Sequence, residues 1–356
     1  MRLLTGTDIS TILRNLSTDQ ANEFLDTLST ALGSYYLEST NEHDSSNKIV
    51  QPPRIAFQTK QDHGNNTVLA MPVSDTTSTV VKVATIPAKG DIAGAITIYS
   101  GETGQLEGVL NAAEITAFRT ALASMTILTR WPAPDSVNFC VFGGGKQAEW
   151  HVRLALLLVP GIGHVTVVNR STKRLEAFEQ DVFAQLRSIH PNVGFRALAQ
   201  QGNNGYQQDL RKVLQEAHII CGCTPSTEPL FPASDLDHGP EERFISLIGS
   251  YKPHMQEIDT ETLDLARQRN GKIWVDQSEA CLEEAGELIK AGLGKDDLKE
   301  IGELFSNERG KRAQLEKGRR LTLFKCVGFG FMDLVISKAL LKTAEDLGKG
   351  VVVDAF

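Results

Sequence analysis

The sequence predicts an α/β protein in which a Rossmann-type, doubly wound parallel sheet is joined to a second, α+β domain. Three observations lead to this prediction. Strands alternate with helices from residue 136 to about 327, a glycine-rich turn connects the first such strand to its helix, and residues 49–110 indicate successive strands instead. Because Trp131–Pro134 resembles a hinge, we expect a Rossmann domain over 131–326 and a second domain over 1–130 plus 327–356.

The part before the hinge has the pattern of an α+β domain. Ser17–Gln20 has the form of a capping box and precedes apolar residues at helical spacing, so a helix is expected to about residue 37. Polar Glu38–Lys48 is expected to be a loop, Gly101–Gly104 a hairpin turn and Ile115–Arg130 a helix. The expected strands are Arg54–Phe57, Thr67–Met71, Thr79–Ala84, Gly94–Tyr99 and Leu106–Leu110.

The first strand and helix after the hinge are joined by a turn that suits a dinucleotide. The apolar run Val137–Phe142 predicts a buried strand, and Trp150–Val159 predicts a helix. Between them, Gly143, Gly145 and Ala148 form G-x-G-x-x-A. The first glycine permits a tight turn, the second lets a pyrophosphate approach the backbone, and the alanine allows close helix packing. A purely structural turn is the alternative, but the strand–turn–helix context favours a dinucleotide site.

The end of the next strand indicates which dinucleotide is preferred. A site for NAD usually has Asp or Glu at this position to bind the ribose 2′-hydroxyl. Here His164–Val168 is followed by Asn169, Arg170, Ser171, Thr172 and Lys173. Cations and hydroxyl groups suit a 2′-phosphate, so NADPH is favoured over NAD. Ser171 or Thr172 can also be an ordinary helix N-cap, and the two roles are compatible.

The remaining elements continue the alternation to the end of the chain. The charged run Arg309–Arg320 is expected to be a solvated face or loop, and Met332–Leu347 a helix that returns to the first domain. The later strands are expected at Gly194–Leu198, His218–Cys223, Phe244–Ile248, Lys272–Val275 and Leu321–Cys326.

Composition limits the class of protein and of partner. A chain of 356 residues with a net charge of −8 is long enough for two cores, and its charge argues against nucleic acid or an anionic membrane as partner. With no signal peptide and no apolar run of membrane length, a cytoplasmic location is expected. No metal-binding spacing is present, and an odd number of cysteines in apolar segments suggests buried thiols: Cys140, Cys221, Cys223, Cys281 and Cys326.

Taken together, the motifs resemble the ornithine cyclodeaminase/mu-crystallin family over nearly the whole chain. The most specific is I-T-A-x-R-T-A at Ile115–Ala121 combined with the glycine turn, extended to His151. The family includes ornithine cyclodeaminases, alanine dehydrogenases, opine-forming dehydrogenases, and ketimine and pyrroline-carboxylate reductases, so the substrate stays open. The resemblance implies a homodimer whose interface is formed by the non-Rossmann domain. Further matching segments are Pro53-Arg54, Val81–Val83, Gly101–Gly104, Cys223–Pro225, Ile248–Tyr251, Glu284–Glu287 and Phe324–Gly328.

Three cations match family positions that engage the substrate carboxylate: Arg54, Lys82 and Arg119. A guanidinium binds a carboxylate bidentately, and a lysine can also transfer a proton. On periodicity alone Arg54 and Lys82 would be edge or surface charges. Lys82 lies inside the apolar run Val80–Ala84, however, where an unused charge is costly, so we expect it to be the proton donor or an orienter of the substrate. The resemblance further implies cofactor contacts by Arg119, Thr120, Lys146, Gln147, Cys223, Thr224, Ser250, Val327 and Gly328.

Two positions depart from the family pattern. Asn111 stands where an aspartate is common, and we expect a lost local hydrogen bond without a change in chemistry. Ser250 stands where cyclodeaminases have an aspartate that handles the second amine, and a serine supplies neither that charge nor a comparable base. His151 and His254 are further acid/base candidates, although lone histidines are mostly structural or solvated.

These observations favour an NADPH-dependent imine (ketimine) reductase, or the reverse amino-acid dehydrogenase, acting on a small carboxylated substrate. The alternatives are an ornithine cyclodeaminase-type ammonia-lyase and a non-catalytic, mu-crystallin-like protein that binds NADPH and a small ligand. Retention of all three cations argues against the non-catalytic alternative.

Overall fold

The computed structural model describes residues 1–40, 48–60, 64–87, 92–268, 271–307, 314–315, 317–318 and 320–354. The chain forms two compact units, one of Met1–Arg119 with Gly328–Phe356 and the other of Thr120–Val327. The division falls within helix α3 (Ala112–Leu128), earlier than the expected boundary at residue 130. Trp131 is buried in the second unit and packs on Phe244, so the segment that suggested a hinge lies inside that unit.

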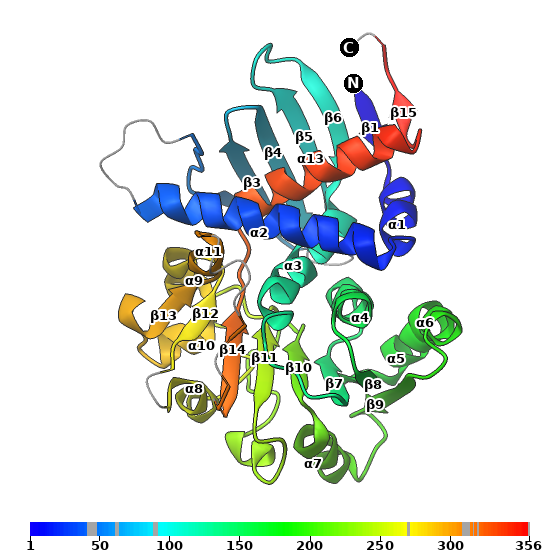
Figure 1. Cartoon of the computed structure of the whole chain (residues 1–356), viewed down its shortest axis with the longest axis vertical. Helices are drawn as coiled ribbons and strands as arrows, with labels where there is room; N and C mark the ends of the chain where they lie inside the picture. The colour runs from blue at the N-terminus through cyan, green and yellow to red at the C-terminus, as the bar shows by residue number, and fades with distance from the viewer. Residues whose placement is uncertain are drawn as a thin grey trace. The chain divides into compact units, whose positions relative to one another are not determined.

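The first unit contains a sheet of seven strands, counted over the described residues, in the order β15-β1-β6-β5-β4-β3-β2 (Figure 1). Strands β2 to β6 form an antiparallel meander, whereas β1 runs parallel to β6. The five strands expected over 49–110 are thus confirmed, while the short β1 and β15 were not predicted. The strands are β1 (Arg2–Leu4), β2 (Ile55–Thr59), β3 (Asn66–Ser74), β4 (Ser78–Ile86), β5 (Ala93–Ser100), β6 (Leu106–Asn111) and β15 (Val351–Val352).

Helices α2 (Thr18–Thr40) and α13 (Gly330–Asp346) pack against each other, and α13 packs on β3, β4 and β5 (Figure 1). The predicted capping box of α2 is confirmed, because the backbone N–H groups of Ser17 and Gln20 each donate to the other residue's side chain, at 3.0 and 3.2 Å. The loop expected over 38–48 is wrong at its start, where α2 continues, and 41–47 lie outside the described residues. An unpredicted helix, α1 (Gly6–Arg14), precedes α2.

The second unit is the predicted doubly wound domain. Its eight strands, again within the described residues, are all parallel and follow the order β13-β12-β14-β11-β10-β7-β8-β9. The strand order reverses at β7, and ligands of such sheets bind at the carboxyl ends of the strands beside this switch point. The strands are β7 (Val137–Phe142), β8 (Ile162–Asn169), β9 (Gly194–Ala199), β10 (Ile219–Gly222), β11 (Arg243–Leu247), β12 (Ile273–Val275), β13 (Leu298–Glu300) and β14 (Leu321–Lys325).

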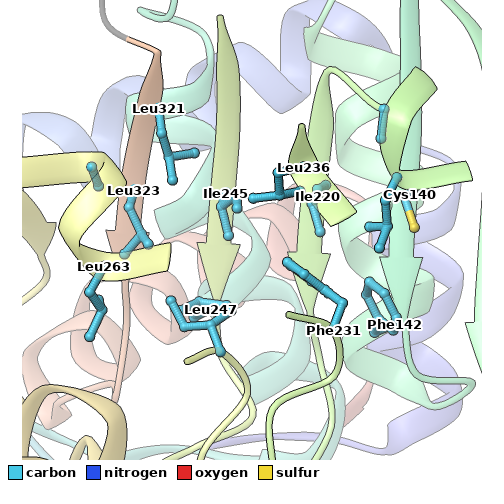
Figure 2. Close-up of a cluster of buried hydrophobic side chains, with 14 of the residues drawn as sticks. Cys140, Phe142, Ile220, Phe231, Leu236, Ile245, Leu247, Leu263, Leu321 and Leu323 are labelled. Carbon is cyan, nitrogen blue, oxygen red and sulfur yellow. The ribbon is translucent and has the colours of Figure 1, made fainter. Parts of the chain in front are cut away.

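Both faces of this sheet are buried, which is why its strands are almost continuously apolar. Cys140, Ile220, Ile245 and Leu323 are register neighbours on four adjacent strands and point to one face, where Leu263 of α8 meets them (Figure 2). The α-helices of this unit, apart from α3, are α4 (Lys146–Leu158), α5 (Thr172–Phe178), α6 (Ala184–Ile189), α7 (Tyr206–Glu216), α8 (Thr260–Arg267), α9 (Ser278–Glu284), α10 (Gly286–Lys290) and α11 (Ile301–Phe305).

The five cysteines are all in described residues and form no disulfide; Cys223 is half-buried and the others are buried, as packed thiols would be. Among the described helices, none has both the length and the apolar character needed to span a bilayer. The charged run over 309–320 lies mostly outside the described residues, so the expectation for it stays a prediction.

Candidate functional site

Lys82 lies in the interior of the first unit. It is in the middle of β4, pairs with Met71 and Ile96, and faces the side of the sheet that α13 covers, so its side chain is only 5% exposed. Burial lowers its pKa to about 8, although the negative charge of Asp333 acts in the opposite direction. A lysine with such a pKa can both release and accept a proton near neutral pH.

Asp333 of α13 joins Lys82 to Arg119. The ammonium of Lys82 donates to both carboxylate oxygens, at 3.0 and 3.2 Å, and Arg119 Nε lies 3.3 Å from Oδ1. Burial alone would raise the pKa of Asp333, but Arg119 and Lys82 outweigh that effect and leave the pKa below its usual value. The carboxylate is therefore ionised between two buried cations, and we call Lys82, Arg119 and Asp333 the buried charge cluster.

Arg54 and Gly328 complete this part of the first unit. The positive charge of Arg54, just before β2, helps to lower the pKa of Lys82, which places it close enough for an electrostatic effect. Gly328 has a φ of +82°, and a Cβ added there would overlap the guanidinium of Arg119. The structure thus brings the three predicted substrate-binding cations together; their contact with a carboxylate stays a prediction.

The predicted dinucleotide turn in the second unit is tight at its first glycine and open at its second. Gly143 has a φ of +120°, and an added Cβ would lie 2.8 Å from the carbonyl oxygen of Cys223, across the switch point. Gly145 is exposed and is the N-cap of α4, without a side-chain cap. The nearest atom to an added Cβ at Gly145 is Arg174 Nη1, 3.9 Å away, so the backbone there is open to a ligand.

Asn169 ends β8 beside this turn. Its Oδ1 accepts a hydrogen bond from the Arg170 backbone at 2.8 Å, whereas its buried Nδ2 has no partner among the described residues. Ser171 Oγ accepts from Arg174 N at 3.4 Å, so the N-cap interpretation is confirmed for Ser171, and Arg170 is exposed. A buried amide donor without a protein partner is a group to which a ribose hydroxyl or phosphate oxygen could bind.

Glu257 connects the loops that follow β10 and β11. Fully buried, it accepts from Thr224 N at 2.8 Å, from Thr224 Oγ1 at 3.0 Å and from Gly249 N at 2.7 Å. Burial raises its pKa, against the opposing charge of Lys325. The sequence argument did not find this residue, although it fixes the loops that contain the expected cofactor contacts Cys223 and Thr224.

Ser250 belongs to a buried network with Lys325 and Glu287. Its hydroxyl donates to Glu287 Oε1 and accepts from Lys325 Nζ, both at 2.6 Å, and Lys325 lies 3.1 Å from Glu287. Because the Ser250 residue is 0% exposed, its side chain is committed to the interior. The cofactor contact expected of Ser250 stays a prediction.

The two histidines considered as acid/base candidates, His151 and His254, lie in different environments. Buried His151 interacts with Ser124 Oγ at 3.0 Å and with the Gln147 carbonyl at 2.7 Å, and burial lowers its pKa to about 4. It is therefore neutral at physiological pH and packed as a structural group. His254 is exposed and follows the Ser250 loop.

Comparison with known proteins settles the family. A family model described as "Ornithine cyclodeaminase/mu-crystallin family" matches residues 17–347. The chain belongs to this family. The resemblance first inferred from the motifs is thereby confirmed, and so is the fold that it implies.

Within the ornithine cyclodeaminase/mu-crystallin family, three proteins illustrate what the chain is similar to. An uncharacterised protein of Saccharomyces cerevisiae is 32% identical over 298 residues, covering 76% of this chain and 80% of that protein. The Delta(1)-pyrroline-2-carboxylate reductase of Bacillus thuringiensis subsp. konkukian is 28% identical over 270 residues, 74% of each chain. The structure of Thermococcus litoralis Delta(1)-pyrroline-2-carboxylate reductase in complex with NADH and L-proline has a TM-score of 0.77 at 21% identity, covering 99% of this chain and 100% of that one.

The departure from the family pattern at Asn111 has less effect than expected. Its Oδ1 accepts from Ala113 N at 3.0 Å at the start of α3, so the predicted loss of a local hydrogen bond is wrong. An amide oxygen can accept this bond as a carboxylate oxygen does. The Asn111 departure thus leaves the entrance to α3 intact.

The remaining expected cofactor residues all lie in the second unit. Ala148 packs α4 against its strand and is buried, whereas Lys146 is exposed on the first turn. Thr120 is buried in α3, and the backbone of Val327 donates to Asp276 at 3.3 Å. Their contacts with a cofactor stay predictions.

Proposed function

We propose that the protein is an NAD(P)-dependent imine reductase that acts on a small carboxylated imine. The single observation that supports this most strongly is the buried charge cluster, in which Lys82 has a pKa of about 8 and lies beside Arg119. Imine reduction needs a carboxylate anchor and one proton donor of intermediate acidity, and the cluster offers both. The amino-acid dehydrogenase reaction is the reverse of the same step.

Each residue of the cluster has a part in the proposed chemistry. Arg54 and Arg119 hold the substrate carboxylate, which a guanidinium can bind through two parallel hydrogen bonds. Lys82 gives a proton to the imine nitrogen during reduction, or takes one from the amine during oxidation. With three cations and one carboxylate from Asp333, this region is positively charged and suits an anionic substrate.

The second unit fits a nicotinamide dinucleotide. The open backbone at Gly145, the N-terminus of α4 and the unpartnered Nδ2 of Asn169 are the groups that would hold its pyrophosphate and ribose. The bound cofactor supplies or accepts the hydride. We propose a preference for NADPH, since exposed Arg170 and the hydroxyl of Thr172 follow Asn169 where an NAD site would have a carboxylate.

Reduction is favoured over cyclodeamination because of Ser250. Cyclodeamination needs a group that accepts the charge and the proton of a distal ammonium. The hydroxyl of Ser250 is neutral and already hydrogen-bonded to Glu287 and Lys325. The relatives named as pyrroline-2-carboxylate reductases agree with this choice.

We also propose that two chains form a homodimer through the open face of the first sheet. Helix α13 covers the face that contains Lys82, and the opposite face, which we call the open face, exposes large apolar side chains of β2 and β4. Ile55 is 59% exposed, Phe57 49% and Val83 42%, and an apolar sheet face of this kind is usually covered by another protein surface. A two-fold axis would bury the same residues on both chains.

The test is a comparison of two substrates with the purified full chain. NADPH oxidation should be followed with Δ1-pyrroline-2-carboxylate and related cyclic ketimines, and proline formation with ornithine and oxidised cofactor. We expect reduction of a carboxylated imine and no appreciable conversion of ornithine. Efficient release of ammonia and proline from ornithine would overturn the assignment and support the cyclodeaminase alternative; binding of NADPH without any turnover would support a non-catalytic protein.

A further inference from the structure

Asp333 stands in an unusual place for a carboxylate. It is in the first turn of α13, its neighbours Met332 and Leu334 are buried, and its side chain is 1% exposed. Leaving a charge in such a place is costly unless the charge is paired, and a paired one is often no more stabilising than an apolar side chain. Stability alone is therefore a weak reason for its presence.

The geometry of Asp333 suggests what it does instead. Both of its oxygens lie within 3.2 Å of Lys82 Nζ, so two of the three ammonium protons can be directed at the carboxylate and the third is left to point elsewhere. It contacts Arg119 through Nε, the one guanidinium nitrogen that is not at the end of the fork. Of the two terminal nitrogens of Arg119, Nη1 lies 3.7 Å from Met332 Sδ, and such a terminal pair can bind a carboxylate bidentately.

We propose that Asp333 is a positioning residue of the imine reductase site, which directs one N–H of Lys82 and the forked end of Arg119 toward the substrate. This inference rests on the proposed function. Asp333 does not touch the substrate in this scheme; it acts through the two cations. If Asp333 served only to stabilise the fold, its replacement would lower stability. It would not change the pH at which the reaction rate falls.

The charges around Lys82 determine the direction of the pH effect. They come from Asp333 on α13, Arg119 on α3 and Arg54 before β2; burial and the two arginines lower the pKa of Lys82, and Asp333 raises it. Reduction requires protonated Lys82, so its rate should fall as the pH rises through the pKa of about 8. Removing the carboxylate should move this fall to lower pH by about 1–3 pH units.

The experiment measures kcat and KM for NADPH-dependent reduction of Δ1-pyrroline-2-carboxylate from about pH 6 to 10. In Asp333→Asn we expect a lower kcat and an alkaline fall at lower pH. In Asp333→Glu the charge is kept but displaced, so kcat should fall while the pH of the alkaline fall stays close to that of the wild type. Lys82→Arg cannot lose its proton, and its residual rate should lack this alkaline fall.

A matched control separates these effects from general damage. Asp235 is also a buried aspartate paired with an arginine, Arg211, at 2.7 Å, but it lies in the second unit. Asp235→Asn should leave the pH profile unchanged, and NADPH binding by fluorescence should confirm that each variant is folded.

If Asp333→Asn has the alkaline fall of the wild type, the inference is wrong while the proposed function stands. If Asp333→Asn does not fold, a wild-type kcat in Asp333→Glu overturns the inference; a wild type that reduces no imine overturns the proposed function itself.

Discussion

Introducing lysines on the open face of the first sheet should convert the proposed dimer to a monomer. Ile55 pairs with Ala70, and Ala70 pairs with Val83, so the two exposed residues lie in one row across three strands. The double variant Ile55→Lys with Val83→Lys places two cations in this row. By two-fold symmetry it places four cations in one interface.

The expected magnitude follows from the exposed fractions. Full burial of an Ile, Val or Phe side chain stabilises by about 1.5–3 kcal/mol, and roughly half of that remains to be gained by Ile55, Phe57 and Val83 in the monomer. At about 1 kcal/mol each, the four substituted side chains of a dimer account for about 4 kcal/mol, or nearly a thousand-fold in Kd. Unpaired lysine charges in the interface would add to this loss.

Sedimentation velocity over a dilution series measures the change in Kd. Ile189→Lys is the matched control. Ile189 is 57% exposed, an exposed fraction similar to the 59% of Ile55, but it lies at the end of α6 in the second unit. We expect a dimer for the wild type and for the control, and a monomer with an unchanged far-UV spectrum for the double variant. A monomeric wild type, or a double variant that dimerises as tightly as the control, would refute the assignment of the open face.

Two further changes test the cofactor and substrate sites. Arg170→Ala should weaken NADPH binding by about 1.5–3 kcal/mol, roughly ten- to a hundred-fold, and leave NADH binding almost unchanged; equal losses for both cofactors in a fluorescence titration would contradict the 2′-phosphate contact. Gly328→Ala should displace the guanidinium of Arg119 and raise KM for the imine about ten-fold or more. Gly292→Ala, at a φ of +66° with no atom within 4 Å of an added Cβ, has similar backbone strain and should leave KM unchanged; equal KM values for the two variants would argue against a substrate role for Arg119.

The parts of the fold that sequence could predict are those with strong local patterns. The capping box before α2, the alternating apolar runs of β3 to β5 and the turn between β7 and α4 each specify their structure within a few neighbouring residues. Strands β1 and β15 have no such pattern. Arg2 pairs with Val352 and with Gly108, so these strands of three and two residues depend on partners that are distant in the sequence.

The same distinction applies to the candidate site. Lys82 was found because a charge interrupts an apolar strand, and Asp333 carries the same signal inside the apolar stretch that begins α13. What sequence could not supply was the pairing of these two residues, 251 positions apart. Glu257 was missed for a related reason, since its three hydrogen bonds to Thr224 and Gly249 depend on how two loops fold over it.

The network around Ser250 gives a physical reason, beyond a missing base, to expect reduction chemistry. Burial tends to lower the pKa of Lys325, but the charges of Glu287 and Glu257 outweigh that effect and raise it. The positive charge of one lysine therefore interacts with two buried carboxylates. An aspartate in place of Ser250 would add a third carboxylate within reach of this one ammonium and would remove the hydroxyl that now donates to Glu287. A buried negative charge without a further cation is costly. A neutral serine that hydrogen-bonds to both Glu287 and Lys325 therefore suits this network. A cyclodeaminase-type aspartate at position 250 would require compensating changes around Lys325 as well.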